Sequence, residues 1–112
     1  MGSSSPLRPL RGELWWIAFP GIDDHPGLIL SVNEVHSAQI TVALLSSKRR
    51  ASSRRIPIGR DATNGLTHPV SYVVATDIFT VPVTSCYERI GMLHQAAMTD
   101  VAAAIRLVLG LG

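Results

Sequence analysis

The sequence predicts a mainly β fold that ends in one helix, because its apolar residues follow two different spacings. Short apolar runs separated by turn residues recur between Glu13 and Met92 and indicate strands. From Met98 onward, apolar residues recur at spacings of three and four, which places them on one face of a helix. Several short strands followed by a helix favour a small, strongly bent antiparallel barrel. With 112 residues and 46% hydrophobic content, the chain is expected to form one domain with a modest core.

The first three predicted strands cover residues 13–19, 27–32 and 39–45 and are close enough in sequence to form a meander. The first is rich in aromatic and branched residues, and Pro20-Gly21 ends it. Because successive side chains of a strand point to opposite faces, we expect either Trp15 or Trp16 in the core. The other tryptophan would then be available to anchor a partner.

The remaining strands are predicted at residues 55–58, 71–75, 79–83 and 88–92, with a turn cluster at 61–65. The helical face that follows consists of Met98, Val101, Ala102, Ile105, Val108 and Leu109. Asp100 near the start of this helix and Arg106 near its end suit the helix dipole, and Gly110 provides a C-terminal stop.

Charge is concentrated rather than spread along the chain. The net charge is +2, yet six of the ten basic residues fall between positions 48 and 60, namely Lys48, Arg49, Arg50, Arg54, Arg55 and Arg60. Such a cluster suits a polyanionic partner. The single cysteine, Cys86, cannot form an intramolecular disulfide and is expected to be a small buried hydrophobe.

Residues 1–10 are expected to form a disordered tail, followed by a single domain over residues 11–112. The first residues are polar and lack the apolar region of a secretory signal. The longest apolar stretch, at the C-terminus, is interrupted by Arg106 and is too short to cross a membrane. We therefore expect a cytoplasmic protein.

Three motifs occur in a fixed order along the chain. Arg11-Gly12-Glu13 opens the first strand, His25-Pro26 opens the second, and Ser46-Ser47 ends the third. Together with the apolar C-terminal segment 101–111, these motifs resemble the MazF/PemK family of toxins from type II toxin–antitoxin systems. The resemblance extends over nearly all of residues 11–112 and implies the SH3-like barrel of the MazF/Kid/CcdB type.

The resemblance implies a metal-independent endoribonuclease that cleaves single-stranded RNA and thereby inhibits translation and growth. In that reaction the ribose 2′-hydroxyl attacks the adjacent phosphate and leaves 2′,3′-cyclic phosphate and 5′-hydroxyl ends. The protein must accept one proton, donate another and stabilise charge on the phosphorane. No metal or other cofactor is expected, because His25, His36, His68 and His94 are not spaced like a known ligand set.

Matching the family's motifs to this sequence selects His25 and Ser46 as the catalytic residues. His25 stands where the family usually has Arg, and Ser46 stands where it has Thr. An imidazole titrates near neutrality but offers fewer donors than a guanidinium, so catalysis here is either altered or lost. The residues expected to bind RNA are Ser47, Lys48, Arg49, Arg50, Thr76 and Asp77.

Two other features depart from the family pattern. Phe79 falls where many members have Arg, and the loop 21–24 is several residues shorter than usual. Asp23 and Asp24 in this loop are candidates for orienting His25, although a pair of aspartates in a Gly/Pro turn is ordinary turn chemistry.

The expected partners are single-stranded RNA, a cognate acidic antitoxin of the MazE type and a second copy of the chain in a homodimer. Two alternatives remain open. One is a catalytically impaired or CcdB-like toxin that binds RNA or gyrase without cleaving RNA, and the other is an SH3-like interaction module. A nuclease would depend on His25 and Ser46, whereas a gyrase poison would depend on the C-terminal helix.

Overall fold

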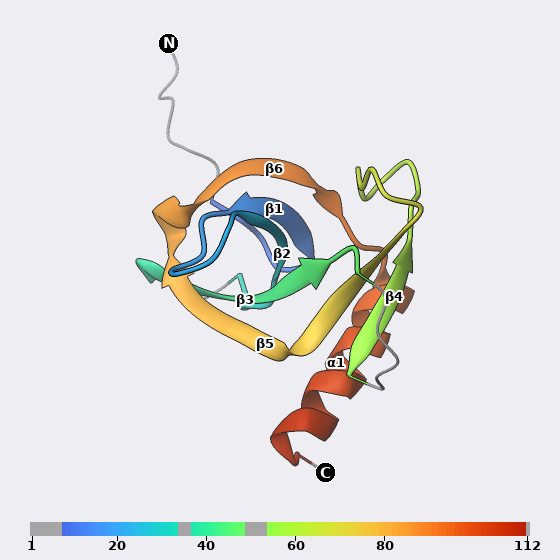
Figure 1. Ribbon diagram of the computed structural model, residues 1–112. Helices are drawn as coiled ribbons and strands as arrows, with labels where there is room; N and C mark the ends of the chain where they lie inside the picture. The colour runs from blue at the N-terminus through green and yellow to red at the C-terminus, as the bar shows by residue number, and fades with distance from the viewer. Residues whose placement is uncertain (1–7, 34–36, 49–53, 112) are drawn as a thin grey trace.

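The computed structural model describes residues 8–33, 37–48 and 54–111. Within these ranges it contains six strands, one short 3-10 helix and one α-helix (Figure 1). In chain order they are β1 (Glu13–Ile17), β2 (His25–Ile29), β3 (Gln39–Ser46), β4 (Arg55–Gly59), β5 (Val70–Pro82), η1 (Val83–Ser85), β6 (Cys86–Met92) and α1 (Gln95–Leu109). The predicted mainly β fold with a C-terminal helix is confirmed.

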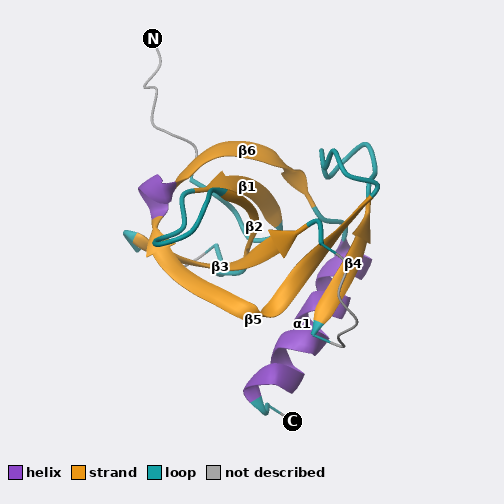
Figure 2. Ribbon diagram, viewed as in Figure 1, coloured by secondary structure: helices purple, strands orange, loops and turns teal. Residues whose placement is uncertain are grey.

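The strands form one antiparallel sheet in the order β4-β5-β3-β2-β1-β6. The first three strands pair with their sequence neighbours, which confirms the predicted meander. The sheet curls strongly, as Figures 1 and 2 show, and has β4 and β6 at its two ends. The curvature gives the sheet an inner face and an outer face, and each face carries its own core.

One prediction about the strands was wrong. Residues 71–75 and 79–82 do not form two strands but belong to the single long strand β5, and Val83 begins η1. The first part of β5 pairs with both β4 and β3, and the last part pairs with β3. Between them the register with β3 shifts, because Ala43 is opposite Ile78 whereas Leu45 is opposite Val73. A bulge of this kind bends a strand without ending it, so the polar pair Thr76-Asp77 marks a bend instead of a loop.

Two clusters of buried side chains form the core. The inner cluster includes Trp15, Ile17, Phe19, Ile29, Ile40, Val42, Leu44, Val74, Val81 and Cys86. The cluster between the sheet and the helix includes Leu14, Leu28, Ala43, Leu45, Ile56, Ile58, Leu66, Val73, Ala75, Leu93, Ala97, Met98 and Val101. Neighbouring residues of β1 and β3 alternate between the two clusters, as expected for strands covered on both faces. Trp15 is buried and Trp16 is 36% exposed, which confirms that the two indole rings point to opposite faces.

Helix α1 packs against β5 and β4. It begins after His94, whose ring Nδ1 accepts a hydrogen bond from the backbone N–H of Ala97 at 3.4 Å. It ends at Gly110, which has the left-handed conformation with φ 72° and so confirms the predicted stop. Met98 and Val101 of the predicted apolar face are buried, whereas Leu109 is 59% exposed. In the described part of the chain, no helix has the length and apolarity to span a membrane.

Candidate functional site

Strand pairing brings the two candidate catalytic residues together. His25 is the first residue of β2, and Ser46 is the last residue of β3. These strands are antiparallel neighbours in which Gly27 is opposite Leu44. Continuing the same register by two residues places His25 opposite Ser46. Because β2 begins two residues earlier than predicted, His25 lies in the sheet and not in the preceding loop.

His25 and Ser46 line a pocket with a volume of about 230 Å³, which we call the His25 pocket. Its walls come from the sheet, from the residues that follow β3 and from the connection between β4 and β5. Leu45 and Leu66, which are buried in the core between sheet and helix, provide apolar surface. The remaining lining residues are Trp16, Asp24, Pro26, Ser47, Lys48, Thr67, His68 and Ser71. The pocket therefore combines a partly exposed indole ring, several hydroxyl groups, two imidazoles and one ammonium group.

The end of β3 is held in place by local hydrogen bonds. The Ser46 hydroxyl oxygen accepts a hydrogen bond from the backbone N–H of Lys48 at 3.1 Å. The guanidinium group of Arg55, at the start of β4, donates to the carbonyl oxygen of Lys48 at 3.3 Å. These contacts turn the chain directly after β3, so that Ser47 and Lys48 both line the His25 pocket.

The other side of the pocket is supported by aromatic groups. The imidazole of His25 lies edge-on to the buried ring of Phe19, with centroids 6.5 Å apart. Asp24 also lines the pocket, and its Oδ2 accepts a hydrogen bond from the hydroxyl of Tyr87 on β6 at 2.7 Å. The pKa of Tyr87 is raised above its ordinary value, mainly by this hydrogen bond to Asp24. The phenol therefore stays protonated and keeps the carboxylate tied to β6.

The predicted RNA-binding residues lie in different parts of the structure. Ser47 and Lys48 line the His25 pocket, and their contact with RNA stays a prediction. Arg49 and Arg50 lie outside the described residues. Thr76 and Asp77 do not line the pocket, because they sit at the bulge of β5. Thr76 and Asp77 therefore lie apart from Ser46, and their contact with RNA stays a prediction.

His68 also lines the pocket and is not among the site residues predicted from the sequence. It belongs to the connection between β4 and β5, in which Asn64 is almost fully buried. The Asn64 amide oxygen accepts hydrogen bonds from the backbone N–H groups of Asp61 and Leu66, and its amide nitrogen donates to the carbonyl of Gly59. Nothing in the sequence marks His68 as a site residue, because a histidine after the predicted turn cluster 61–65 is ordinary in a surface loop.

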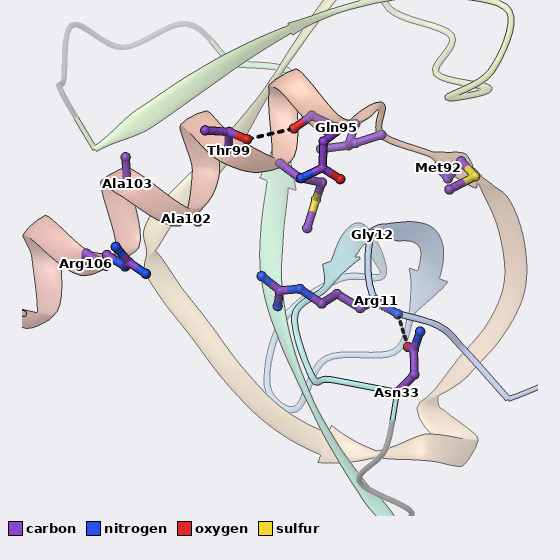
Figure 3. Close-up of a pocket in the computed structure, with 11 residues that line it drawn as sticks. Arg11, Gly12, Asn33, Met92, Gln95, Thr99, Ala102, Ala103 and Arg106 are labelled. Atoms are coloured by element: carbon purple, nitrogen blue, oxygen red, sulfur yellow. Dashed lines mark hydrogen bonds between the residues drawn. The ribbon is translucent and has the colours of Figure 1, made fainter.

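A larger groove lies beside α1, and Figure 3 shows its first part. This helix groove comprises two adjoining cavities of about 470 Å³ and 350 Å³ that share Arg11, Met98, Ala102 and Arg106. The backbone N–H of Arg11 donates to Oδ1 of Asn33 at 2.7 Å, and its guanidinium donates to the carbonyl of Leu30. No histidine, carboxylate or cysteine lines the groove in the described part of the chain. The groove combines the two guanidinium groups of Arg11 and Arg106 with apolar surface from Met98.

Two further observations concern side chains that bind metals or act as nucleophiles. The described residues contain no group of three or more His, Cys, Asp or Glu side chains that could hold a metal ion. Cys86 is buried, as expected, and burial raises the pKa of its thiol to about 11. A thiol with that pKa stays protonated at neutral pH and is a poor nucleophile.

Comparisons with known proteins identify the family and the fold. Residues 10–109 match the family described as PemK-like, MazF-like toxin of type II toxin-antitoxin system. The fold is similar to that of an endoribonuclease solved with its cognate antitoxin from a mycobacterial species, with 28% identity, a TM-score of 0.80 and coverage of 93% of this chain and 97% of that one. It is also similar to the Mycobacterium tuberculosis toxin MazF-mt6, with 28% identity, a TM-score of 0.79 and coverage of 89% and 98% of the two chains.

A third structure, a MazE–MazF complex from Deinococcus radiodurans, shares the fold at 20% identity with a TM-score of 0.77, covering 96% of this chain and 100% of that one. No curated protein sequence matches the chain significantly. The family match spans nearly all of the folded residues, and the solved structures have the same architecture over most of their length. The chain therefore belongs to the PemK-like, MazF-like family of toxins from type II toxin–antitoxin systems.

Proposed function

We propose that this protein is an endoribonuclease toxin that cleaves single-stranded RNA at the His25 pocket by attack of the ribose 2′-hydroxyl on the adjacent phosphate. The observation that carries the proposal is the meeting of His25 and Ser46 in one pocket, since these are the positions at which the family has Arg and Thr. Membership of the family supports the reaction class, and a solved relative is named an endoribonuclease.

The pocket offers groups that can accept the 2′-hydroxyl proton, contact the phosphate and stabilise its charge. The imidazole of His25 accepts the proton of the 2′-hydroxyl, as a histidine can near neutral pH. The Ser46 hydroxyl already accepts a hydrogen bond from the N–H of Lys48, so its proton is available to donate to a phosphate oxygen. The ammonium group of Lys48 stabilises the charge that develops on the phosphorane.

Trp16 provides a surface for a nucleobase. Its indole ring lines the same pocket and is 36% exposed, whereas Trp15 is enclosed in the core. Aromatic side chains bind single-stranded RNA by stacking on unpaired bases, which every base allows. Stacking on Trp16 would hold a nucleotide next to His25 with its base splayed from its neighbours.

For the antitoxin, we propose an acidic segment that binds in the helix groove. The groove combines two guanidinium groups, from Arg11 and Arg106, with apolar surface from Met98 and Ile105. This pattern suits a peptide that carries both carboxylates and apolar side chains. One solved relative, the mycobacterial endoribonuclease, is in complex with its cognate antitoxin, which supports a protein partner of this kind.

We also propose that the toxin is a homodimer. In addition to family membership, this rests on the apolar end of α1 and the residue beyond it. Leu107, Leu109 and Leu111 are between 59% and 71% exposed, which is expensive for leucine side chains unless a partner covers them.

The test is cleavage of a long single-stranded RNA by the purified protein in EDTA, comparing wild type with His25→Ala and Ser46→Ala. We expect metal-independent cuts that leave 2′,3′-cyclic phosphate and 5′-hydroxyl ends, and a loss of roughly 10²-fold or more in rate for His25→Ala. Matched controls are His94→Asn, which removes an imidazole but keeps an acceptor for the helix cap, and Ser85→Ala in η1.

Both controls should cut like the wild type. If the wild type is inert on varied RNAs, the nuclease assignment is wrong and binding without cleavage becomes the better account. If both pocket variants cut as fast as the wild type, the chemistry is located elsewhere.

A further inference from the structure

The His25 pocket contains a second imidazole that the family comparison does not select. His25 comes from β2 and His68 from the connection between β4 and β5, and both line the same volume of about 230 Å³ as Ser46. The reaction requires an acid as well as a base, because the 5′-oxygen leaves as a hydroxyl only after it receives a proton. A histidine that donates this proton would complete the proton transfers that His25 alone leaves unfinished.

Backbone contacts hold His68 in position. The N–H of Arg60 donates to the carbonyl of Pro69 at 3.0 Å, and the Arg60 guanidinium donates to the carbonyl of Thr67, also at 3.0 Å. The residues on either side of His68 are therefore tied to the same arginine. The amide of Asn64 closes the base of this connection. Support of this kind fixes the backbone from which the His68 side chain enters the pocket lining.

The different exposure of the two imidazoles indicates which acts as the acid. His25 is half-buried against Phe19, whereas His68 is exposed at the rim. The departing RNA strand has to leave towards solvent, so its 5′-oxygen belongs on the side of His68. The other charged groups that line the pocket in the described residues are Asp24 and Lys48, and β5 contributes the uncharged Ser71. Asp24 already accepts the hydroxyl of Tyr87.

From this arrangement we propose that His68 is the general acid of the reaction and His25 its general base; this inference rests on the proposed function. The 2′-hydroxyl gives its proton to His25 as its oxygen bonds to phosphorus. The bond between phosphorus and the 5′-oxygen breaks, and His68 in its protonated form gives its proton to that oxygen. The products are the 2′,3′-cyclic phosphate, the 5′-hydroxyl, protonated His25 and neutral His68, so protons and charge balance.

The test compares two substrates of the same sequence in EDTA. One is ordinary RNA, and the other has sulfur in place of the 5′-oxygen at the cleavage site, because a thiolate leaves without being protonated first. We expect His68→Ala to lose roughly 10²-fold in kcat on RNA and little on the sulfur substrate. His25→Ala should be impaired on both, since both need the 2′-hydroxyl proton removed. His68→Gln, which keeps a polar side chain of similar size, should behave as His68→Ala does.

The pH dependence provides an independent readout. The rate of the wild type on RNA should fall at low pH, where the base is protonated, and at high pH, where the acid has lost its proton. His68→Ala should lose the fall at high pH and keep the fall at low pH.

Three results would overturn the assignment of His68: equal losses on both substrates, which indicate a role in binding or folding; no loss on either; or an unchanged fall at high pH in His68→Ala. A wild type that cleaves neither substrate would instead overturn the proposed nuclease function.

Discussion

Replacing Gly91 with alanine should loosen the support of the His25 pocket from a distance. Gly91 lies in β6 opposite Leu14. A Cβ added there would lie 2.4 Å from the carbonyl oxygen of Asn64 and 2.5 Å from that of Thr63. These are backbone atoms of the connection that carries His68, so no flexible side chain can move aside to relieve the contact.

The size of the effect follows from this geometry. Overpacking a dense site typically costs about 1–3 kcal/mol, and a contact with backbone belongs at the upper end, about 3 kcal/mol. For a domain of this size, that destabilisation lowers the melting temperature by on the order of 10 °C. The connection between β4 and β5 must also shift away from β6, which would displace His68 and lower RNA cleavage more than binding.

The matched control is Gly59→Ala in β4, where an added Cβ meets no atom within 4 Å. That variant should be neutral or more stable by about 0.5 kcal/mol, because alanine restricts the unfolded chain more than glycine does. Thermal and urea unfolding of both variants measure the difference, and RNA cleavage measures the effect on the site. Equal melting temperatures for the two variants would refute the reasoning about close packing between β6 and the connection.

Three further predictions follow from named contacts. The Glu13 carboxylate accepts hydrogen bonds from Leu10 N–H, Trp15 Nε1 and Arg89 Nε. Burial opposes ionisation of this carboxyl, but the hydrogen bonds outweigh it and hold its pKa below the ordinary value of 4.5. The stability that the ionised carboxylate contributes is therefore present above pH 4.5 and lost as the pH falls through the lowered pKa. Glu13→Gln should therefore lower the melting temperature at pH 7 and much less at pH 3, and an equal loss at both would contradict this. Lys48→Ala should weaken RNA binding and reduce the slope of the logarithm of the association constant against the logarithm of the salt concentration by about 1. Fluorescence titration at several salt concentrations measures this slope. An unchanged slope would place Lys48 away from the phosphates. Trp16→Ala should weaken RNA binding by about 1–3 kcal/mol with little change in the salt slope. Trp16→Phe should recover part of that loss, because it restores an aromatic ring. Equal RNA affinities for wild type and Trp16→Ala would exclude stacking.

The sequence by itself determined the features that depend on neighbouring residues. Alternation along the first strand predicted that Trp15 and Trp16 would point to opposite faces, and the helical spacing with Gly110 predicted α1 and its end. The order of the short motifs was enough to indicate the family and to select His25 and Ser46. These signals are readable because they are set by periodicity, by turn residues or by chemistry at a fixed place in a motif.

Only the tertiary structure decided which distant residues meet. Thr76-Asp77 falls between two strands predicted separately. In the structure β3 pairs with β5 both before and after these residues, so β5 continues through them as a bulge. Likewise, nothing local distinguished His68 from a histidine in an ordinary loop. It reaches the His25 pocket because Asn64 and Arg60 fold its connection back towards the end of β3. Contacts of this kind depend on register and loop closure across many residues, which the spacing of residues along one segment does not encode.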